Sequence, residues 1–165
     1  MKIHFLLENN MAKEIERKFL MDLNFWSTDV IGVHYRQGYL AVTEKGIVRV
    51  RTKGEVATLT IKSSGIGISR DEFEYEIPMD EAKLLLTLCE NDIIEKTRYK
   101  VMAEGKQWDV DKFHGKNEGL WIAEVELESE GESVTLPKWA IEEVTGDERF
   151  YNVYLSKHPY TEWTK

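Results

Sequence analysis

Charged residues that alternate with other residues constrain the fold of this sequence more than any other feature. In the stretch Glu14-Ile15-Glu16-Arg17-Lys18, the side chains of Glu14, Glu16 and Lys18 share one side if the chain is extended. Two carboxylates and an ammonium group make a poor hydrophobic core, but they suit divalent cations that hold a polyanion. The stretch therefore predicts a strand whose polar face binds ions, and a sheet with a polar interior if other strands repeat the pattern.

The same period of two recurs along the chain and predicts eight strands. They cover residues 13–21, 33–43, 46–53, 56–63, 69–77, 94–103, 106–113 and 119–128. Short connections with turn residues, among them Lys53-Gly54 and Glu104-Gly105, favour antiparallel neighbours. Eight antiparallel strands are enough to close a barrel and leave no free edge.

Helical periodicity appears in two further regions. Asp80 is a candidate N-cap for a helix that runs to about Asn91 and has one apolar side. A second helical region lies between Pro137 and Pro159, with a break at Gly146. The predicted fold class is therefore α+β and mainly β, a closed eight-stranded barrel with flanking helices.

The charges on the predicted strand faces are segregated by strand. Arg49 and Arg51 share one face, whereas Glu124 and Glu126 share another. A solvated polar face is the ordinary explanation for a single amphipathic strand. It explains the set less well, because these faces are almost fully charged and like charges two residues apart repel unless an ion bridges them. We therefore expect the charged faces to line the barrel and the apolar faces to point outward, under the helices.

Composition narrows the class of protein. The chain has 165 residues, which suits one domain, and we expect residues 11–165 to form it and residues 1–10 to be a loose leader. A net charge of −8 without a basic tract argues against nucleic acid as the main partner. No apolar run approaches the roughly 20 residues that span a bilayer, so we expect no membrane partner. Cys89 is the single cysteine, which favours a reducing cytoplasm.

Taken in order along the chain, the motifs resemble those of the CYTH proteins, or triphosphate tunnel metalloenzymes, whose hallmark is Glu-x-Glu-x-Lys on the first strand. The resemblance runs from about Met11 to Leu155. The similar pieces are Glu14 to Lys18, Gln37-Gly38-Tyr39-Leu40, Val48-Arg49-Val50-Arg51, Thr60-Ile61-Lys62, Glu72 to Pro78, Lys96-Thr97-Arg98-Tyr99, Trp108 to Phe113 and Ala123 to Leu127. The resemblance implies a closed tunnel of eight antiparallel strands that binds triphosphate compounds with Mg²⁺ or Mn²⁺.

On this basis the candidate site residues fall into three groups. The expected metal ligands are acidic: Glu14, Glu16, Glu124 and Glu126, with Asp111 as a helper and Asp109 as a weaker one. The expected phosphate ligands are basic: Lys18, Arg49, Arg51, Lys62, Lys96 and Arg98. Glu72 and Glu74 are expected to orient the basic residues or water. Among all of these, Glu14, Glu16, Lys18 and Glu126 are expected to be catalytic.

The activity that the resemblance implies is metal-dependent hydrolysis of a small triphosphate, above all inorganic tripolyphosphate, to diphosphate and orthophosphate. Class IV adenylyl cyclase and thiamine triphosphatase are the alternatives within the family. A polyphosphate-binding module without catalysis is the alternative from another class, because the same charged residues can bind without turnover. Beyond the small triphosphate, the sequence leaves a homodimer open.

Overall fold

One antiparallel sheet forms the body of the protein. The computed structural model describes residues 15–63 and 72–163. Their strands are β1 (Ile15–Met21), β2 (Val33–Thr43), β3 (Gly46–Lys53), β4 (Val56–Ser63), β5 (Glu72–Glu76), β6 (Ile94–Ala103), β7 (Lys106–Phe113), β8 (Trp121–Leu127) and β9 (Ala140–Glu143). The strand order across the sheet is β5-β4-β3-β2-β6-β7-β8-β1-β9.

The strand predictions are largely confirmed, because the hairpin turns have the chemistry that antiparallel neighbours need. The bounds of β2, β3, β4, β6 and β7 agree with the predicted ones, and β8 is shorter by two residues at its start and one at its end. Between β6 and β7, Glu104 and Gly105 both have positive φ (48° and 76°), as a tight two-residue hairpin turn requires. The first residues predicted for β1 and β5 lie outside the described residues.

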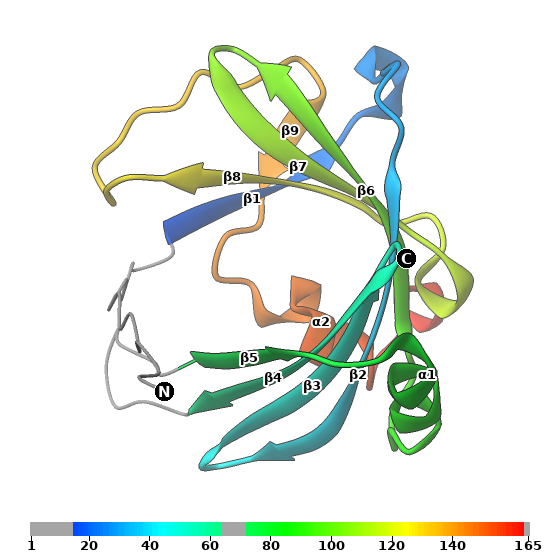
Figure 1. The fold of residues 1–165 in the computed structure, drawn as a ribbon. Helices are drawn as coiled ribbons and strands as arrows, with labels where there is room; N and C mark the ends of the chain where they lie inside the picture. Colours follow the sequence, from blue (N-terminus) through cyan, green and yellow to red (C-terminus); the bar gives the residue numbers. More distant parts are fainter. Residues whose placement is uncertain (1–14, 64–71, 164–165) are drawn as a thin grey trace, which may run out of the picture.

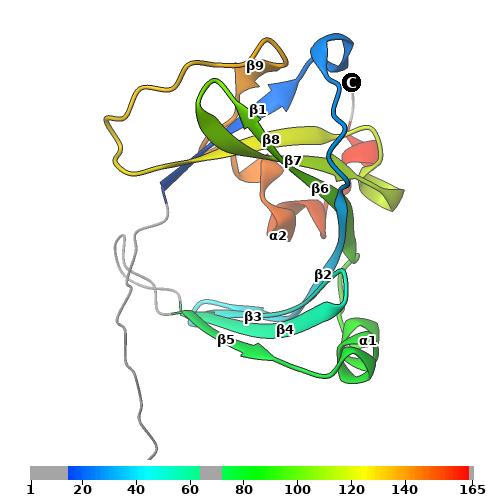
Figure 2. The ribbon, with the colours of Figure 1, turned by 45° about the horizontal axis from the view of Figure 1, so that its top comes forward.

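The sheet curves strongly, so that β2 to β5 face β1, β7, β8 and β9 across it, with β6 joining the two sides (Figures 1 and 2). In the described residues β5 pairs only with β4, and β9 pairs only with β1. Over residues 15–63 and 72–163 the sheet therefore has nine strands rather than the predicted eight, and its two edge strands are not paired with each other. The closed barrel stays a prediction.

The ninth strand lies in a region that we predicted to be helical, and that prediction is wrong. β9 pairs with β1, with Phe19 opposite Glu143 and Leu20 opposite Glu142. Helix propensity is a weak preference, and pairing with the outer edge of β1 outweighs it here. The rest of the predicted helical region is broken into a 3-10 turn (Glu148–Phe150), the short helix α2 (Asn152–Leu155) and a second 3-10 turn (Tyr160–Glu162).

Helix α1 (Met79–Thr87) covers the outer face of β2 to β4 (Figure 1). Its buried residues Ala82 and Leu86 pack against Val50 and Ala57 of the sheet. Asp80 does not cap this helix, because the N-cap position is Pro78; Asp80 lies in the first turn, where a carboxylate favours the helix dipole.

The two faces of the sheet differ in character, as the sequence predicts. On the outer face Phe19, Trp108 and Val125 form a buried cluster that Trp139 covers. On the inner face only one end is apolar, where Ile94, Phe113 and Ile122 pack with Phe150 and Leu155 from the α2 region, shown between the two sides of the sheet in Figure 2. The remainder of the inner face carries mostly charged and polar side chains, with the buried Tyr35 and Tyr39 among them. Within the described residues, no helix has the length and apolar character to cross a bilayer.

Candidate functional site

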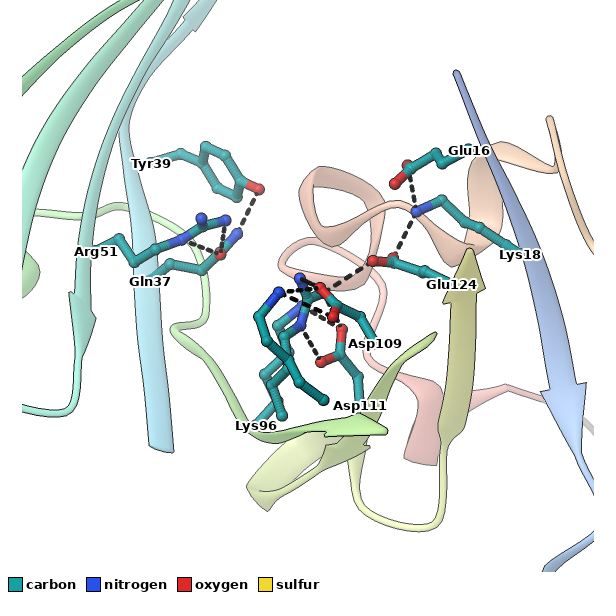
Figure 3. A network of polar contacts seen from close by, with 11 residues as sticks. Glu16, Lys18, Gln37, Tyr39, Arg51, Lys96, Asp109, Asp111 and Glu124 are labelled. Carbon is teal, nitrogen blue, oxygen red and sulfur yellow. Dashed lines mark hydrogen bonds and ion pairs between the residues drawn. The ribbon is translucent and has the colours of Figure 1, made fainter. Parts of the chain in front are cut away.

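The register of the sheet places the alternating charged residues on the inner face. Each pairing aligns inner-face residues of neighbouring strands. The aligned pairs are Glu16 and Glu126, Lys18 and Glu124, Glu124 and Asp109, Asp111 and Arg98, Gln37 and Arg51, Arg51 and Thr58, and Lys62 and Glu72. Figure 3 shows labelled side chains from both sides of the sheet pointing toward the space between them.

An acidic wall, defined here as Glu16, Asp109, Glu124 and Glu126, occupies one side of this space. These four side chains line a pocket of about 200 Å³ together with Lys100, Lys106 and Gln107. The Lys18 ammonium lies between two members of the wall, 2.7 Å from Glu16 Oε1 and 2.6 Å from Glu124 Oε1. Burial opposes the charge of Lys18, but Glu124 and Glu16 outweigh it and raise the pKa of the ammonium group.

Glu126 is the exposed member of the acidic wall. Within the described residues its carboxylate has no ion pair or hydrogen bond, although Glu16 lies directly opposite it on β1. Like charges directly opposite each other destabilise a strand pair. A bound cation would remove that repulsion, so the geometry favours cation binding at Glu16 and Glu126.

A cluster of ionic side chains, Lys96, Arg98 and Asp111, lies on β6 and β7 and contacts the acidic wall. Asp111 accepts hydrogen bonds from Lys96 Nζ (2.5 Å) and from Arg98 Nε and Nη2 (2.7 and 2.6 Å). Arg98 also donates to Asp109 (2.7 Å) and to Glu124 (2.8 Å). Burial opposes the charge of Asp111, but Lys96 and Arg98 lower its pKa, whereas burial lowers the pKa of Lys96. Lys96 and Asp111 are almost fully buried. Because a buried charge needs an opposite charge beside it, their main contribution is to neutralise each other.

A basic wall, defined here as Arg49, Arg51 and Lys62, lies across from the acidic one. Arg51 donates from Nε and Nη2 to the Gln37 Oε1 atom (3.0 and 2.8 Å), and in the described part of the chain no carboxylate pairs with it. Burial and the neighbouring charges of Arg49 and Arg98 lower the pKa of Arg51 to about 10. This cation is thus partly buried, and its partners in the described residues are neutral: the Gln37 amide and the Tyr35 ring, 5.7 Å away.

The other two basic residues have acidic partners from β5. Arg49 Nη2 donates to Thr60 Oγ1 (3.1 Å) and lies 3.7 Å from Glu74 Oε2, whereas Lys62 Nζ lies 2.9 Å from Glu72 Oε2. The Arg49 Nε atom is buried without a hydrogen-bond partner in the described residues. A buried donor without an acceptor is costly, so the basic wall favours an anion with several oxygens.

Nearly all the predicted site residues lie on this inner face; Glu14 is outside the described residues. The structure brings Glu16, Glu124 and Glu126 to one pocket, but it places Asp111 in the buried cluster with Lys96 and Arg98. The role of Asp111 as a metal ligand stays a prediction. Sequence reasoning assigned no role to Gln37 and Thr60, although Gln37 stands in a motif that carries the family resemblance.

The donor chemistry of the acidic wall fits Mg²⁺ or Mn²⁺, because carboxylate oxygens are the hard ligands that both ions take. In residues 15–63 and 72–163, no three potential ligand groups lie close enough together to hold a metal ion in the side-chain positions described. Glu16 and Glu124 are held by Lys18 instead. The wall therefore fits a divalent cation by its chemistry, and ion binding would require Lys18 to share these carboxylates.

Comparison with known proteins identifies the family. The family model of the CYTH domain matches residues 12–151. An inorganic triphosphatase from Acetivibrio thermocellus is 48% identical over 151 residues, covering 91% of this chain and 97% of the relative. An inorganic triphosphatase from Nitrosomonas europaea is 37% identical over 147 residues, covering 87% of this chain and 96% of the relative.

The fold agrees as well. The crystal structure of an inorganic triphosphatase superposes with a TM-score of 0.72 at 35% identity, covering 88% of this chain and 95% of that one. The family model, the full-length relatives and the sheet with its charged inner face all lead to the same assignment: this chain belongs to the CYTH domain family.

Proposed function

We propose that this protein is a divalent-metal-dependent triphosphatase that hydrolyses inorganic tripolyphosphate to diphosphate and orthophosphate. One observation carries the proposal: two walls of opposite charge face each other, and each has a member without a counter-ion in the described residues, Glu126 on one side and Arg51 on the other. A polyanion with a divalent cation satisfies both at once. The two curated relatives, both named inorganic triphosphatase, support the same substrate.

The basic residues would bind and orient the phosphate oxygens. Phosphoryl transfer depends mainly on positioning and on neutralising charge. Arg51 and Arg49 would provide directed guanidinium donors, and Lys62 a point charge that Glu72 holds in place. Lys18 lies between Glu16 and Glu124, so it would contact a phosphate oxygen at the boundary between the two walls.

Glu16, Glu124 and Glu126 would hold the divalent cation, with Glu14, which lies two residues before Glu16 in the sequence, as a further ligand. When bound, Mg²⁺ or Mn²⁺ neutralises phosphate charge and lowers the pKa of a coordinated water. Glu126 is the exposed carboxylate of the set and would accept a proton from water. Closure of the curved sheet into a tunnel would surround the substrate and strengthen these contacts by excluding solvent.

Orthophosphate release from tripolyphosphate tests the proposal directly. The wild-type protein is assayed separately with Mg²⁺, Mn²⁺ and Ca²⁺ and after removal of metal with EDTA. We expect release with Mg²⁺ or Mn²⁺ and none with EDTA. Glu126→Gln should lose at least about 100-fold in rate, a typical cost of removing an acid–base group. Glu90→Gln, an exposed residue after α1, is the matched control and should keep the wild-type rate.

The same assay separates the competing functions. Orthophosphate from thiamine triphosphate at a higher kcat/KM than from tripolyphosphate would indicate a thiamine triphosphatase. Pyrophosphate with cyclic AMP from ATP would indicate a cyclase. Tight binding of tripolyphosphate without any release of phosphate, with all three metals, would contradict the proposed hydrolysis and favour a binding module.

A further inference from the structure

Gln37 is a fully buried amide on the inner-face side of β2, directly opposite Arg51 of β3. We propose that Gln37 is a positioning residue: it holds the Arg51 guanidinium in place while leaving its positive charge available to the substrate. This inference rests on the proposed function, because it assigns to Arg51 a phosphate group as the missing counter-charge.

The orientation of the amide is determined by its neighbours. Gln37 Oε1 accepts from Arg51 Nε (3.0 Å) and Nη2 (2.8 Å), and Gln37 Nε2 donates to the Tyr39 hydroxyl (2.9 Å). A guanidinium can only donate, so a flipped amide would set donors against donors. Tyr39 is itself nearly buried and fixes the far end of the amide (Figure 3). Arg51 is thus held by two hydrogen bonds in one orientation.

Arg51 differs from the other cations of the inner face. Six of the others lie within 4.0 Å of at least one carboxylate in the described residues: Lys18, Arg49, Lys62, Lys96, Arg98 and Lys100. Lys53, on the same face of β3, has no such partner there, but it is exposed to solvent, whereas Arg51 is partly buried. Arg98, the opposite extreme, contacts three carboxylates. A glutamate at position 37 could make the same two hydrogen bonds to Arg51 and would neutralise it. The neutral amide keeps the geometry of such a pair without the neutralisation.

Arg51 is partly buried. A cation that is partly removed from water and lacks a counter-ion is unfavourable, so this arrangement favours binding of an anion. The Arg51 Nη1 atom makes no hydrogen bond within residues 15–63 and 72–163, and Figure 3 shows the guanidinium turned toward the space that faces the acidic wall. A phosphate oxygen there would complete both the charge and the hydrogen bonding. If a carboxylate were already paired with Arg51, a phosphate oxygen would compete poorly for this guanidinium.

The variant Q37E tests this inference, because it changes the charge at nearly constant size. We expect Q37E to keep the wild-type fold and a Tm at least equal to that of the wild type, since the introduced carboxylate pairs with Arg51. Its KM for tripolyphosphate should rise by about 10- to 100-fold, the usual range for losing a charged hydrogen-bonding partner. The dissociation constant for tripolyphosphate in EDTA, measured by calorimetry, should rise by a similar factor.

Two further variants make the result specific. T135E adds the same charge at an exposed loop position and should leave KM unchanged. In an R51A background, adding Q37E should change KM by less than about threefold, because the charge that it neutralises is gone. A wild-type KM for Q37E, or an equal rise in KM with and without Arg51, would overturn the inference.

If Q37E does not fold, Q37M provides the second test. It keeps the Arg51 charge but removes the acceptor, so the affinity for tripolyphosphate should fall by about 3- to 10-fold, the cost of ordering a free side chain. Unchanged affinity in Q37M would also overturn the inference. Failure of the proposed function would differ from these outcomes, since the wild-type protein itself would then release no orthophosphate.

Discussion

Substitutions of single residues of the acidic wall should differ in their effect on stability, although these residues carry the same charge. Glu124 lies between Lys18 and Arg98, and its side chain is only 15% exposed. Burial and Asp111 oppose its charge, but the nearby cations Lys96, Lys18 and Arg98 lower its pKa. Glu126 is exposed and, among the described residues, has no such partner. Loss of activity alone therefore does not separate a ligand from a structural carboxylate.

The first prediction compares Glu124→Gln with Glu126→Gln in urea unfolding without metal. Glu124→Gln should lower the free energy of unfolding by about 3 kcal/mol, because it leaves two partly buried cations with less counter-charge. Glu126→Gln should change it by less than about 0.5 kcal/mol. Equal stability of the two variants would contradict the assigned contacts of Glu124.

Most charged residues of the site could be predicted from the sequence, and the reason is the period of two. Once a stretch is extended, Arg49 and Arg51 must share a face, whatever the rest of the chain does. Gln37 could not be recognised in the same way, since a neutral amide in a strand has no charge pattern. Its role depends on Arg51, which lies opposite it through the β2–β3 register. Likewise, the pairing of Asp111 with Lys96 appears only when β6 and β7 are aligned.

At the scale of elements, β9 shows where local sequence patterns are insufficient. Its four residues include two glutamates and were predicted to be helical. Glu143 instead forms a two-point contact with Arg17, Nε to Oε1 at 2.8 Å and Nη2 to Oε2 at 2.6 Å. Arg17 is the charged exception on the otherwise apolar face of β1. The charged Arg17 on an apolar face and the acidic Glu143 in a strand are explained together, because they are partners in one ion pair. This pairing is apparent only once β9 is aligned with β1.

The second prediction concerns pH. The hydrogen bond from Arg17 lowers the pKa of Glu143 from its ordinary 4.5 to about 2. A lowered carboxyl pKa contributes stability that is present above about pH 4.5 and is lost as the pH falls through 2. Glu143→Gln should therefore reduce stability at pH 7 by no more than about 1 kcal/mol, because the pair is partly exposed. Between pH 5 and pH 2 the variant should lose less stability than the wild type, as measured by urea unfolding; parallel curves would contradict the assignment.

The third prediction tests the packing of α1 against β2, the strand that carries Gln37. A Cβ atom added at Gly38 would lie 2.5 Å from the Cys89 Sγ atom and 2.7 Å from Ile93. Gly38→Ala should therefore lower the free energy of unfolding by about 1 to 3 kcal/mol, the cost of overpacking. Adding Cys89→Ala should recover part of that loss, because it removes the closest atom. If Cys89→Ala gives no recovery, the strand and the helix end do not pack as described.

At the scale of the whole molecule, the curvature of the sheet could not be obtained from the sequence patterns. The patterns show where strands begin and end, but the pairing of β1 with β8 and β9 and of β2 with β6 joins residues that are distant in the chain. Such pairing depends on packing of both faces together, including the cover from α1 and the α2 region. The number of strands and the state of the sheet edges follow from that packing.

The arrangement of the two walls also predicts a coupling between ligands. The molecule has a net charge of −8, so it would repel a triphosphate anion at long range, whereas the basic wall and Lys18 would attract the anion at short range. A divalent cation on the acidic wall would contact the same anion, so each ligand should strengthen the binding of the other. Coupling between two ligand sites is typically about 5- to 150-fold.

The fourth prediction measures this coupling with a tripolyphosphate analogue whose bridging oxygens are replaced by NH groups, which prevents hydrolysis. Mg²⁺ should lower the dissociation constant of the analogue for the wild-type protein at least about 10-fold in calorimetry. Magnesium also binds the free analogue in solution, and that contribution is the same for every variant. In Glu126→Gln the gain should therefore shrink to the solution contribution, because the exposed carboxylate of the acidic wall is absent. An equal gain in both proteins would show that the acidic wall holds no cation next to the triphosphate.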